Sequence, residues 1–305
     1  SIKTDNAGNV FVGGAFTNAG GIPVNYIAKW NGTTWSSLGS GLNGYPYSLR
    51  DVGSNIIVGG VFTMAGGDSA KYVAKWNGSS WSPMPGLNDV VYSISVDNGG
   101  NIYAGGNFTF VSGNVVVSRC IARWNGISWL PLGSGTNGSV TGIEFIGANL
   151  FAVGQFTNAG GVTGVNGVAR WNGSNWFSLA GGLSGGISTL AVQGTDLYVG
   201  GGMTGFIAKW NGSAWSQLGS GLNSLPNALL IFENKLYIGG TFTIAGGTTA
   251  NFYAVWDGNR LAAPTLSIPA GNYSSLTLNN YSGFVINGNV NITGGLTLTS
   301  GNVKL

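Results

Sequence analysis

The feature that most constrains the fold of this sequence is a short tryptophan motif that returns at a regular interval. It first occurs from Trp30 to Trp35, with the sequence WNGTTW. Trp-Asn-Gly or Trp-Asp-Gly begins again at five positions: Trp76, Trp124, Trp171, Trp210 and Trp256. These copies are 46, 48, 47, 39 and 46 residues apart, and a period of this length is typical of repeat proteins. A second tryptophan follows five residues after the first in every copy except the last, which has Leu261, so the motif accounts for all 11 tryptophans.

The Asn-Gly pair inside the motif predicts a β-hairpin with a two-residue type I′ turn. In that register Trp30 lies opposite Thr33, and Trp35 lies opposite Ala28. An alanine stands two residues before the first tryptophan in every copy, and a small residue opposite a large one suits interdigitating layers. We therefore expect the tryptophans to form the core and not a ligand platform.

Each repeat is predicted to contain four short strands. The second strand ends in a glycine pair such as Gly59-Gly60, with Val153-Gly154 in the fourth copy, and a loop that usually begins with Phe-Thr and carries Ala-Gly-Gly follows. The third strand ends at the first tryptophan, and the fourth begins near the second. Repeats of this kind are typical of propeller blades. We predict an all-β fold in which residues 1–263 form a six-bladed β-propeller, with a seventh blade upstream of Ser1 as the alternative.

The pattern changes at Pro264, after which no tryptophan occurs. Short alternating runs such as 276–278 are separated by turn sequences such as Asn287-Gly288. We predict that residues 264–305 form a β-rich segment of the solenoid or stalk type. Because it stops in the middle of its pattern, we expect it to be truncated.

The repeats resemble those of two groups of known proteins. A glycine pair with a tryptophan about 16 residues later is similar to kelch-type repeats. The Trp-Asn-Gly-x-x-Trp hairpin with Gly-Gly-x-Phe-Thr resembles more closely the propeller repeats of secreted bacterial surface proteins, and this resemblance covers roughly residues 1–263. Stalks like the segment that follows are often joined to propellers in large adhesins. The resemblance is specific for architecture, because propellers host many functions.

The resemblance implies a non-enzymatic binding or display module of a secreted or cell-surface bacterial protein. Such a protein would be an adhesin or a surface-motility cargo of a dedicated secretion system such as type IX. Its partners would be a cell-surface or extracellular protein or glycan, together with the outer-membrane secretion machinery. A glycan-binding lectin and a sialidase-like glycoside hydrolase are the alternative functions.

Composition argues against several other classes of function. Only 7% of residues are charged, and Lys and Arg form no basic run, so we predict no nucleic-acid partner. No apolar run approaches the roughly 18 residues of a membrane helix, so we predict no membrane insertion. The chain has no histidine and one cysteine, Cys120, which removes the commonest general base and metal ligands. We therefore expect no catalytic residues, no metal and no cofactor, and we expect Cys120 to fill the core.

The acidic and basic residues give only weak signs of catalysis. A glycosidase needs two carboxylates beside one bond, and the nine acids are spread over the repeats; Glu144 and Glu233 would meet only if the ring brought them together. A sialidase needs an arginine cluster, but Arg123, Arg170 and Lys209 occupy one repeated position before the first tryptophan. That repetition favours a structural role over a ring of cations for anionic glycans.

Two acidic turns, Asp5–Asn9 and Asp97–Asn101, are similar to parts of calcium-binding loops. They lack the further acids and the final glutamate of an EF-hand. Asp and Asn form hairpin turns without an ion, so we predict turns here and not metal sites.

The candidate binding site lies on loops, where binding residues concentrate on a rigid scaffold. In a four-stranded blade, the loops between strands two and three and the connectors between blades emerge on one face. We therefore expect the Phe-Thr loops to share a face with the Gly-Ser-Gly-Leu-Asn connectors. The candidate binding residues there are Tyr45, Asn88, Phe110 and Asn137. The alternative is that these loops only solvate the rim.

Overall fold

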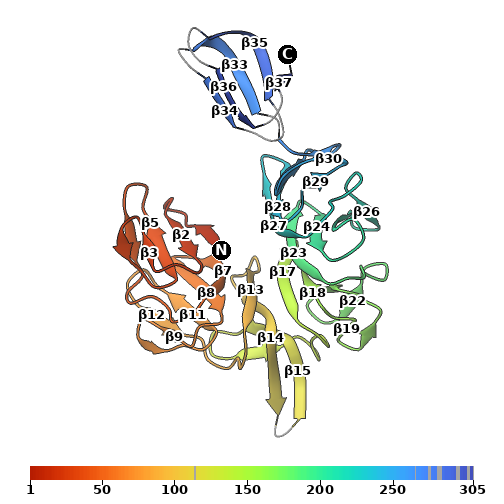
Figure 1. Cartoon of the computed structure of the whole chain (residues 1–305). Coiled ribbons are helices and arrows are strands. Elements are labelled where there is room, and N and C mark those ends of the chain that lie inside the picture. The colour runs from red at the N-terminus through yellow and green to blue at the C-terminus, as the bar shows by residue number, and fades with distance from the viewer. Residues whose placement is uncertain are drawn as a thin grey trace. The chain divides into compact units, whose positions relative to one another are not determined.

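The computed structural model is an all-β six-bladed propeller of four-stranded antiparallel blades, as the repeats predict (Figure 1). It describes the backbone of residues 1–112, 115–264, 266–273, 276–279, 284–292, 296–300 and 303–304, and the side chains of 1–109 and 118–264. The described residues contain no helix, and so none long and apolar enough to cross a membrane. The chain divides into two compact units, Ser1–Ile187 and Ser188–Leu305.

The first unit contains blades 1 to 4, one for each of the first four repeats. The strands of blades 1 and 2 are β1 (Ile2–Thr4), β2 (Val10–Gly13), β5 (Ile27–Trp30), β6 (Trp35–Ser37), β7 (Pro46–Val52), β8 (Asn55–Gly60), β11 (Val73–Trp76) and β12 (Trp81–Pro83). Those of blades 3 and 4 are β13 (Val91–Val96), β14 (Ile102–Ser112), β15 (Val115–Trp124), β16 (Trp129–Pro131), β17 (Val140–Ile146), β18 (Asn149–Gly154), β21 (Val168–Trp171) and β22 (Trp176–Ser178). The first strands of neighbouring blades pack together, β7 against β13 and β13 against β17.

Short two-stranded hairpins occupy the Phe-Thr loops of four repeats, three in the first unit and one in the second. They pair β3 (Asn18–Ala19) with β4 (Ile22–Pro23), β9 (Met64–Ala65) with β10 (Asp68–Ser69), β19 (Asn158–Ala159) with β20 (Val162–Thr163), and β29 (Ile244–Ala245) with β30 (Thr248–Thr249). Blade 3 differs, because β14 and β15 continue as one long hairpin that extends beyond the other strands of the blade (Figure 1).

The second unit contains the blades of the fifth and sixth repeats and the C-terminal segment. The blade strands are β23 (Ile187–Gln193), which begins at the last residue of the first unit, β24 (Asp196–Gly201), β25 (Ile207–Trp210), β26 (Trp215–Gln217), β27 (Pro226–Phe232), β28 (Lys235–Gly240), β31 (Tyr253–Trp256) and β32 (Leu261–Ala262). The short fifth repeat has a tight connection between β24 and β25, in which Met203 is buried.

The C-terminal strands pair in parallel, unlike those of the blades. They are β33 (Leu266–Tyr273), β34 (Leu276–Asn279), β35 (Phe284–Ile292), β36 (Leu296–Ser300) and β37 (Val303–Lys304). Strand β35 pairs with β33 and β37, and β34 pairs with β36. Leu266 lies opposite Phe284, and Leu276 opposite Leu296. Parallel pairing of successive strands is typical of a solenoid; the solenoid itself, the boundary at 263/264 and the stalk role of this segment stay predictions.

The predicted two-residue turn of the tryptophan hairpin is wrong. Trp30 lies directly opposite Trp35, so four residues form the turn. Asn31 explains the difference, because its side-chain oxygen accepts the N–H groups of Thr33 and Thr34 at 2.9 and 2.8 Å. An asparagine that binds its own turn in this way replaces the type I′ geometry, and of the turn residues only Gly32 has positive φ.

The tryptophans are buried or half-buried, as the core prediction requires. The two rings of a hairpin lie 5.3–5.4 Å apart in five repeats. The second tryptophan also joins blades: the indole N–H of Trp81 donates to the carbonyl of Leu38 at 2.7 Å, and that of Trp176 donates to the carbonyl of Leu132 at 2.9 Å. Each of these carbonyls belongs to the preceding blade, so the tryptophan fastens one blade to the next.

The glycines of the repeat allow this close packing. A Cβ on Gly59 would lie 2.6 Å from the side chain of Val91 in the next blade, and one on Gly105 would lie 2.6 Å from Val140. The first glycine of Ala-Gly-Gly has a related role, because a Cβ on Gly160 would lie 2.3 Å from the Trp176 ring. The glycine pair therefore admits side chains of the neighbouring blade.

Candidate functional site

The connectors between blades lie on the Phe-Thr loops, so the two share a face as predicted. Leu42 of the first connector forms a β-bridge with Ala65 of the second Phe-Thr loop, and Thr136 forms the same bridge with Ala159. The same connector also contacts the blade it leaves, because the N–H of Leu42 donates to the carbonyl of Asn25 at 3.1 Å. We use the term junction for each place where a connector contacts the loop of the blade that precedes it in the chain. Each junction has the number of that blade.

Two of the predicted binding residues, Asn88 and Asn137, have structural partners. The Asn137 side chain accepts the N–H groups of Thr157 and Asn158 at 2.9 Å each and donates to the Thr157 hydroxyl at 3.0 Å. Asn88 makes the corresponding bonds to the N–H and the hydroxyl of Thr109, at 2.8 and 3.0 Å. Asn43 and Asn223 repeat this arrangement. These asparagines fasten four of the five connectors to the next Phe-Thr loop, which leaves them little capacity for a ligand; the fourth connector has Ser184 at this position.

Tyr45 is half exposed, as a ligand contact would require, with 46% of its surface accessible. Its ring contacts Tyr26 edge to face, with ring centroids 5.4 Å apart. Phe110 lies in β14 opposite Ser118, and its side chain lies outside the described residues. Tyr45, Asn88 and Asn137 stand at junctions 1, 2 and 3, so they do not form a single cluster. Their binding role stays a prediction.

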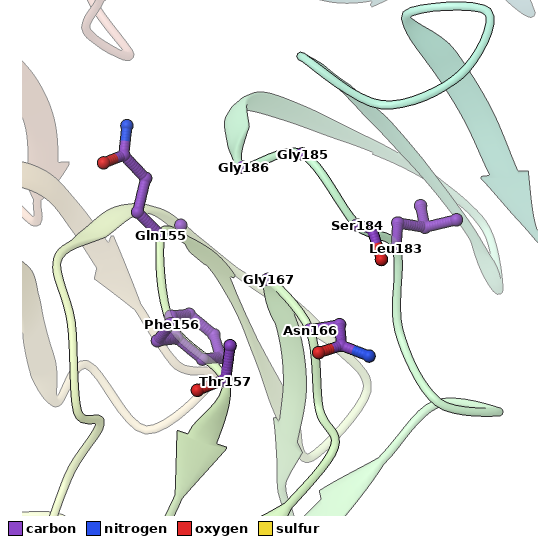
Figure 2. A pocket seen from close by; sticks show the side chains of 10 residues that line it. Gln155, Phe156, Thr157, Asn166, Gly167, Leu183, Ser184, Gly185 and Gly186 are labelled. Atoms are coloured by element: carbon purple, nitrogen blue, oxygen red, sulfur yellow. The ribbon is translucent and has the colours of Figure 1, made fainter.

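A pocket of about 500 Å³ opens at junction 4. Figure 2 shows Gln155, Phe156 and Thr157 on one side of it and the segment from Leu183 to Gly186 on the other, with Asn166 and Gly167 between them. Gly154 completes the lining. The volume falls within the range of about 300–1,000 Å³ that is usual for small-molecule sites.

The pocket exists because two side chains present at other junctions are missing at this one. The first position, four residues before the first tryptophan, has positive φ in every repeat. Its residues are Tyr26, Tyr72, Cys120, Gly167, Phe206 and Phe252. The second position precedes the first strand of the next blade. Its residues are Tyr45, Val90, Ser139, Gly186 and Leu225. Two tyrosine rings meet at junction 1, whereas junction 4 has two glycines, which leave that volume open.

Backbone groups around the pocket are already hydrogen-bonded. Gly167 donates its N–H to the carbonyl of Phe156 at 2.7 Å and accepts the N–H of Gly154 at 3.0 Å. The N–H of Leu183 donates to the carbonyl of Asn166 at 2.7 Å, and the Asn166 side chain donates to the carbonyl of Gly181 at 2.8 Å. The exposed side chains of the lining are further candidates to bind a ligand.

The polar side chains that line the pocket are uncharged. Gln155 and Ser184 are exposed, and their carboxamide and hydroxyl groups lie in the lining of the pocket. Phe156 adds a buried aromatic ring. None of the ten lining residues is ionisable, so the pocket can hold a polar neutral molecule.

A smaller pocket of about 240 Å³ lies at junction 3, lined in part by Ser118, Arg119, Thr136 and Asn137. The Ser118 hydroxyl is buried and has no hydrogen-bond partner within the described residues. A buried polar group of this kind is usually satisfied by an ordered water. Sequence reasoning found Asn137 but missed Ser118, because nothing in the repeat distinguishes this serine.

The acidic residues considered for catalysis have other roles. Glu144 on β17 forms an ion pair with Arg50 on β7 and accepts the hydroxyl of the buried Ser95 at 3.1 Å. Arg50 also donates to the carbonyl of Ile94 at 2.8 Å, so this network links the first strands of blades 2, 3 and 4. Glu233 has positive φ in the turn that joins β27 to β28.

The two acidic turns hold their carboxylates in the way predicted for turns. Asp97 accepts the N–H groups of Gly99 and Asn101 at 2.9 Å each and the Asn101 side chain at 2.8 Å. Burial raises the pKa of Asp97, but these bonds and one from Tyr103 outweigh it, so the pKa lies below its ordinary value of 3.8. In the described residues, no group of three or more acidic, cysteine or histidine side chains is placed to hold a metal ion.

Three of the five cations at the position before the first tryptophan, Lys29, Arg170 and Lys209, lie over aromatic rings. The Arg170 guanidinium is 4.8 Å from the centre of the Phe177 ring, and the Lys209 amine is 5.7 Å from that of Tyr198. Lys209 also forms an ion pair with Asp196 at 2.6 Å. These contacts give the repeated cations a structural role. Cys120 is buried, as expected for a core residue, and burial raises the pKa of its thiol.

Comparisons with known proteins identify the fold. No family model matches the sequence, and no curated protein matches it. Among solved structures, the chain is similar to a chain of the mitotic checkpoint complex, with a TM-score of 0.58, 16% identity, and coverage of 84% of this chain and 72% of that one. It is also similar to the extracellular domain of a hybrid two component system from B. thetaiotaomicron, with a TM-score of 0.56 and 11% identity over 86% of this chain. It spans 32% of that second chain. At these identities the likeness shows the propeller fold alone.

Proposed function

We propose that this chain is a non-enzymatic binding and display module of a secreted or cell-surface bacterial protein, of the adhesin type. The observation that supports this most is the pocket at junction 4, which has no ionisable side chain in its lining. A hydroxyl such as that of Thr157 or Ser184 needs an adjacent base to act as a nucleophile, and none of the lining residues is a base. Such a pocket can bind and orient a ligand but has no group to transform it.

The extracellular setting rests on the resemblance of the repeats to those of secreted bacterial surface proteins. A chain of this kind would be exported by a dedicated secretion system such as type IX and would meet the outer-membrane secretion machinery on the way. Its partner outside the cell would be a glycan or a protein. The polar, weakly charged composition fits such a role, since 7% of residues are charged.

A sialidase-like hydrolase is the alternative that the charges favour least. Such an enzyme needs arginines free to bind a carboxylate, whereas Arg50 is bound to Glu144 and to the carbonyl of Ile94. A panel of chromogenic glycosides tests this directly. We expect no turnover. A turnover that is lost in Glu144→Gln or Glu233→Gln would overturn the non-enzymatic assignment.

Binding is tested by adding the labelled chain to bacterial or host cells and to immobilised extracellular glycans and proteins. We expect saturable binding that survives deletion of residues 264–305. Tyr45→Ala tests the contribution of junction 1 with thermal stability as the control. If deletion of 264–305 abolishes binding while the propeller stays folded, the C-terminal segment is the adhesive part and the propeller is not.

A further inference from the structure

We propose that the pocket at junction 4 is a binding site for a neutral saccharide, and that Gly167 and Gly186 are the residues that make it one. This inference rests on the proposed binding function and names its ligand class and its place. It follows from three features of the pocket: the missing side chains, the uncharged lining and the paired backbone.

The missing side chains distinguish this junction from junction 1. Tyr26 and Tyr45 occupy the corresponding positions at junction 1, where their rings are 5.4 Å apart. The backbone bonds around the first position are nearly the same in the two blades: Tyr26 donates to the carbonyl of Phe16 at 3.0 Å, and Gly167 donates to that of Phe156 at 2.7 Å. The backbone is therefore retained while the side chains are absent, which leaves a pocket within the ordinary architecture of the blade.

The uncharged lining selects a neutral ligand. An anionic sugar such as a sialic acid needs a cation to offset the loss of hydration around its carboxylate, and the ten lining residues include no Lys or Arg. The Gln155 carboxamide offers both donors and an acceptor, and the Ser184 hydroxyl offers one donor and an acceptor. Hydroxyl groups, which both donate and accept, match this set.

The paired backbone argues against an extended peptide as the ligand. A peptide that adds a strand needs a row of free N–H and C=O groups. Here the N–H groups of Gly154, Gly167 and Leu183 and the carbonyls of Phe156 and Asn166 are bonded within the protein. Recognition in this proposal therefore comes mainly from the exposed Gln155 and Ser184 side chains, which suit a compact polyhydroxylated ring, since Phe156 is buried and adds little surface.

The chain itself supplies the variant that closes the pocket. Gly167→Tyr places at junction 4 the residue that blades 1 and 2 have at this position, where φ is 62° and 66° against 78° at Gly167. A Cβ on Gly167 would lie 3.1 Å from the carbonyl oxygen of Gly154 and 3.2 Å from the Ile187 side chain, so small shifts accommodate it. Gln155→Ala is the second variant, which removes a ligand group without adding bulk.

The experiment measures binding of the full chain to a panel of neutral and sialylated oligosaccharides, followed by calorimetry on the best neutral ligand. We expect Gly167→Tyr to abolish detectable binding, and Gln155→Ala to raise the Kd roughly three- to tenfold, the loss of one hydrogen bond. Two matched controls should leave the Kd unchanged: Phe252→Tyr, which changes the same position in blade 6, and Val61→Ala, which changes the position of Gln155 in blade 2. Melting curves identify a variant that fails to fold.

The outcomes separate this inference from the proposed function. Binding of only sialylated ligands, or neutral binding that both pocket variants retain, overturns the inference but leaves a binding module. If no oligosaccharide binds while an extracellular protein does, the saccharide is wrong and the module stands. If the chain binds neither, the proposed function fails as well.

Discussion

Removal of the indole N–H of Trp176 should weaken the attachment of blade 4 to blade 3. This tryptophan is 4% exposed, and its N–H donates to the carbonyl of Leu132 at 2.9 Å in a buried setting. Its ring lies 5.3 Å from that of Trp171. The same position in the last repeat is Leu261, so the fold tolerates an apolar residue there, and the question is how much stability the hydrogen bond adds.

The expected magnitude depends on the substitution. Trp176→Phe leaves the buried carbonyl of Leu132 without its donor, which costs about 1–3 kcal/mol of unfolding free energy. Trp176→Ala also removes most of the buried ring and its contact with Trp171, and deletion of a buried aromatic costs about 3–5 kcal/mol. In a unit of this size each kcal/mol lowers the melting temperature by about 2–4 °C.

Urea denaturation followed by circular dichroism, with differential scanning calorimetry beside it, measures both losses. Ile127→Ala is the control, because Ile127 is 85% exposed in the corresponding hairpin of blade 3 and should change the free energy by less than about 0.5 kcal/mol. The reasoning is refuted if Trp176→Phe unfolds at the urea concentration of the wild type, since a buried carbonyl would then have lost its donor without cost.

Substitutions at three further residues have outcomes that the contacts predict. Glu144→Ala should cost about 1–3 kcal/mol of unfolding free energy by urea denaturation, because the buried hydroxyl that donates to Glu144 loses its acceptor. Glu144→Gln should cost less than about 1 kcal/mol, because the half-exposed ion pair with Arg50 adds little. Equal costs for the two variants would contradict this reasoning. Because the pKa of Asp97 is lowered in the folded state, its ionised carboxylate stabilises the fold fully at a pH above the unfolded-state pKa of 3.8, and this stabilisation is lost as the pH falls through the folded-state pKa. Asp97→Asn should therefore reduce the decrease in melting temperature below pH 4. An unchanged dependence of melting temperature on pH would count against this reasoning. Asn88→Ala should increase the rate of hydrogen exchange at the N–H of Thr109, because this N–H donates to the Asn88 side chain at 2.8 Å. An unaltered exchange rate would mean that this hydrogen bond does not hold the loop.

The architecture could be predicted because the tryptophan period is long, regular and repeated six times. One detail was wrong: Asn-Gly is a hairpin signal, but the side chain of Asn31 binds the turn that follows it and widens the turn to four residues. A two-residue turn and a four-residue turn share the same dipeptide, and only the bonds of the asparagine side chain distinguish them. The prediction that the tryptophans are core was argued from that register, which placed Trp35 opposite Ala28. It holds although Trp35 lies opposite Trp30, because the two rings pack on each other.

The candidate site was harder to predict, because it depends on which positions meet in space. Asn88 and Asn137 were chosen as loop residues, yet both fasten connectors to loops, a role that their recurrence in the connectors could have indicated. Gly167 and Gly186 are visible departures from the repeat. Their importance follows from two structural facts: the position of Gly167 has positive φ in every blade, and the position of Gly186 lies beside it. Neither fact can be derived from sequence spacing alone.

At the position with positive φ, the side chain can differ between blades without a change in the backbone hydrogen bonds. Its backbone N–H and carbonyl make the same bonds whether the residue is Tyr26 or Gly167, so the side chain is not needed to hold the loop. A residue with a Cβ in this region costs of order 1–2 kcal/mol, and an aromatic residue there must offset that cost by contacts such as the one between Tyr26 and Tyr45. A glycine loses the contact and also avoids the cost. A pocket at this position therefore opens with little net loss of stability, which is why junction 4 can be open where aromatic side chains fill junction 1.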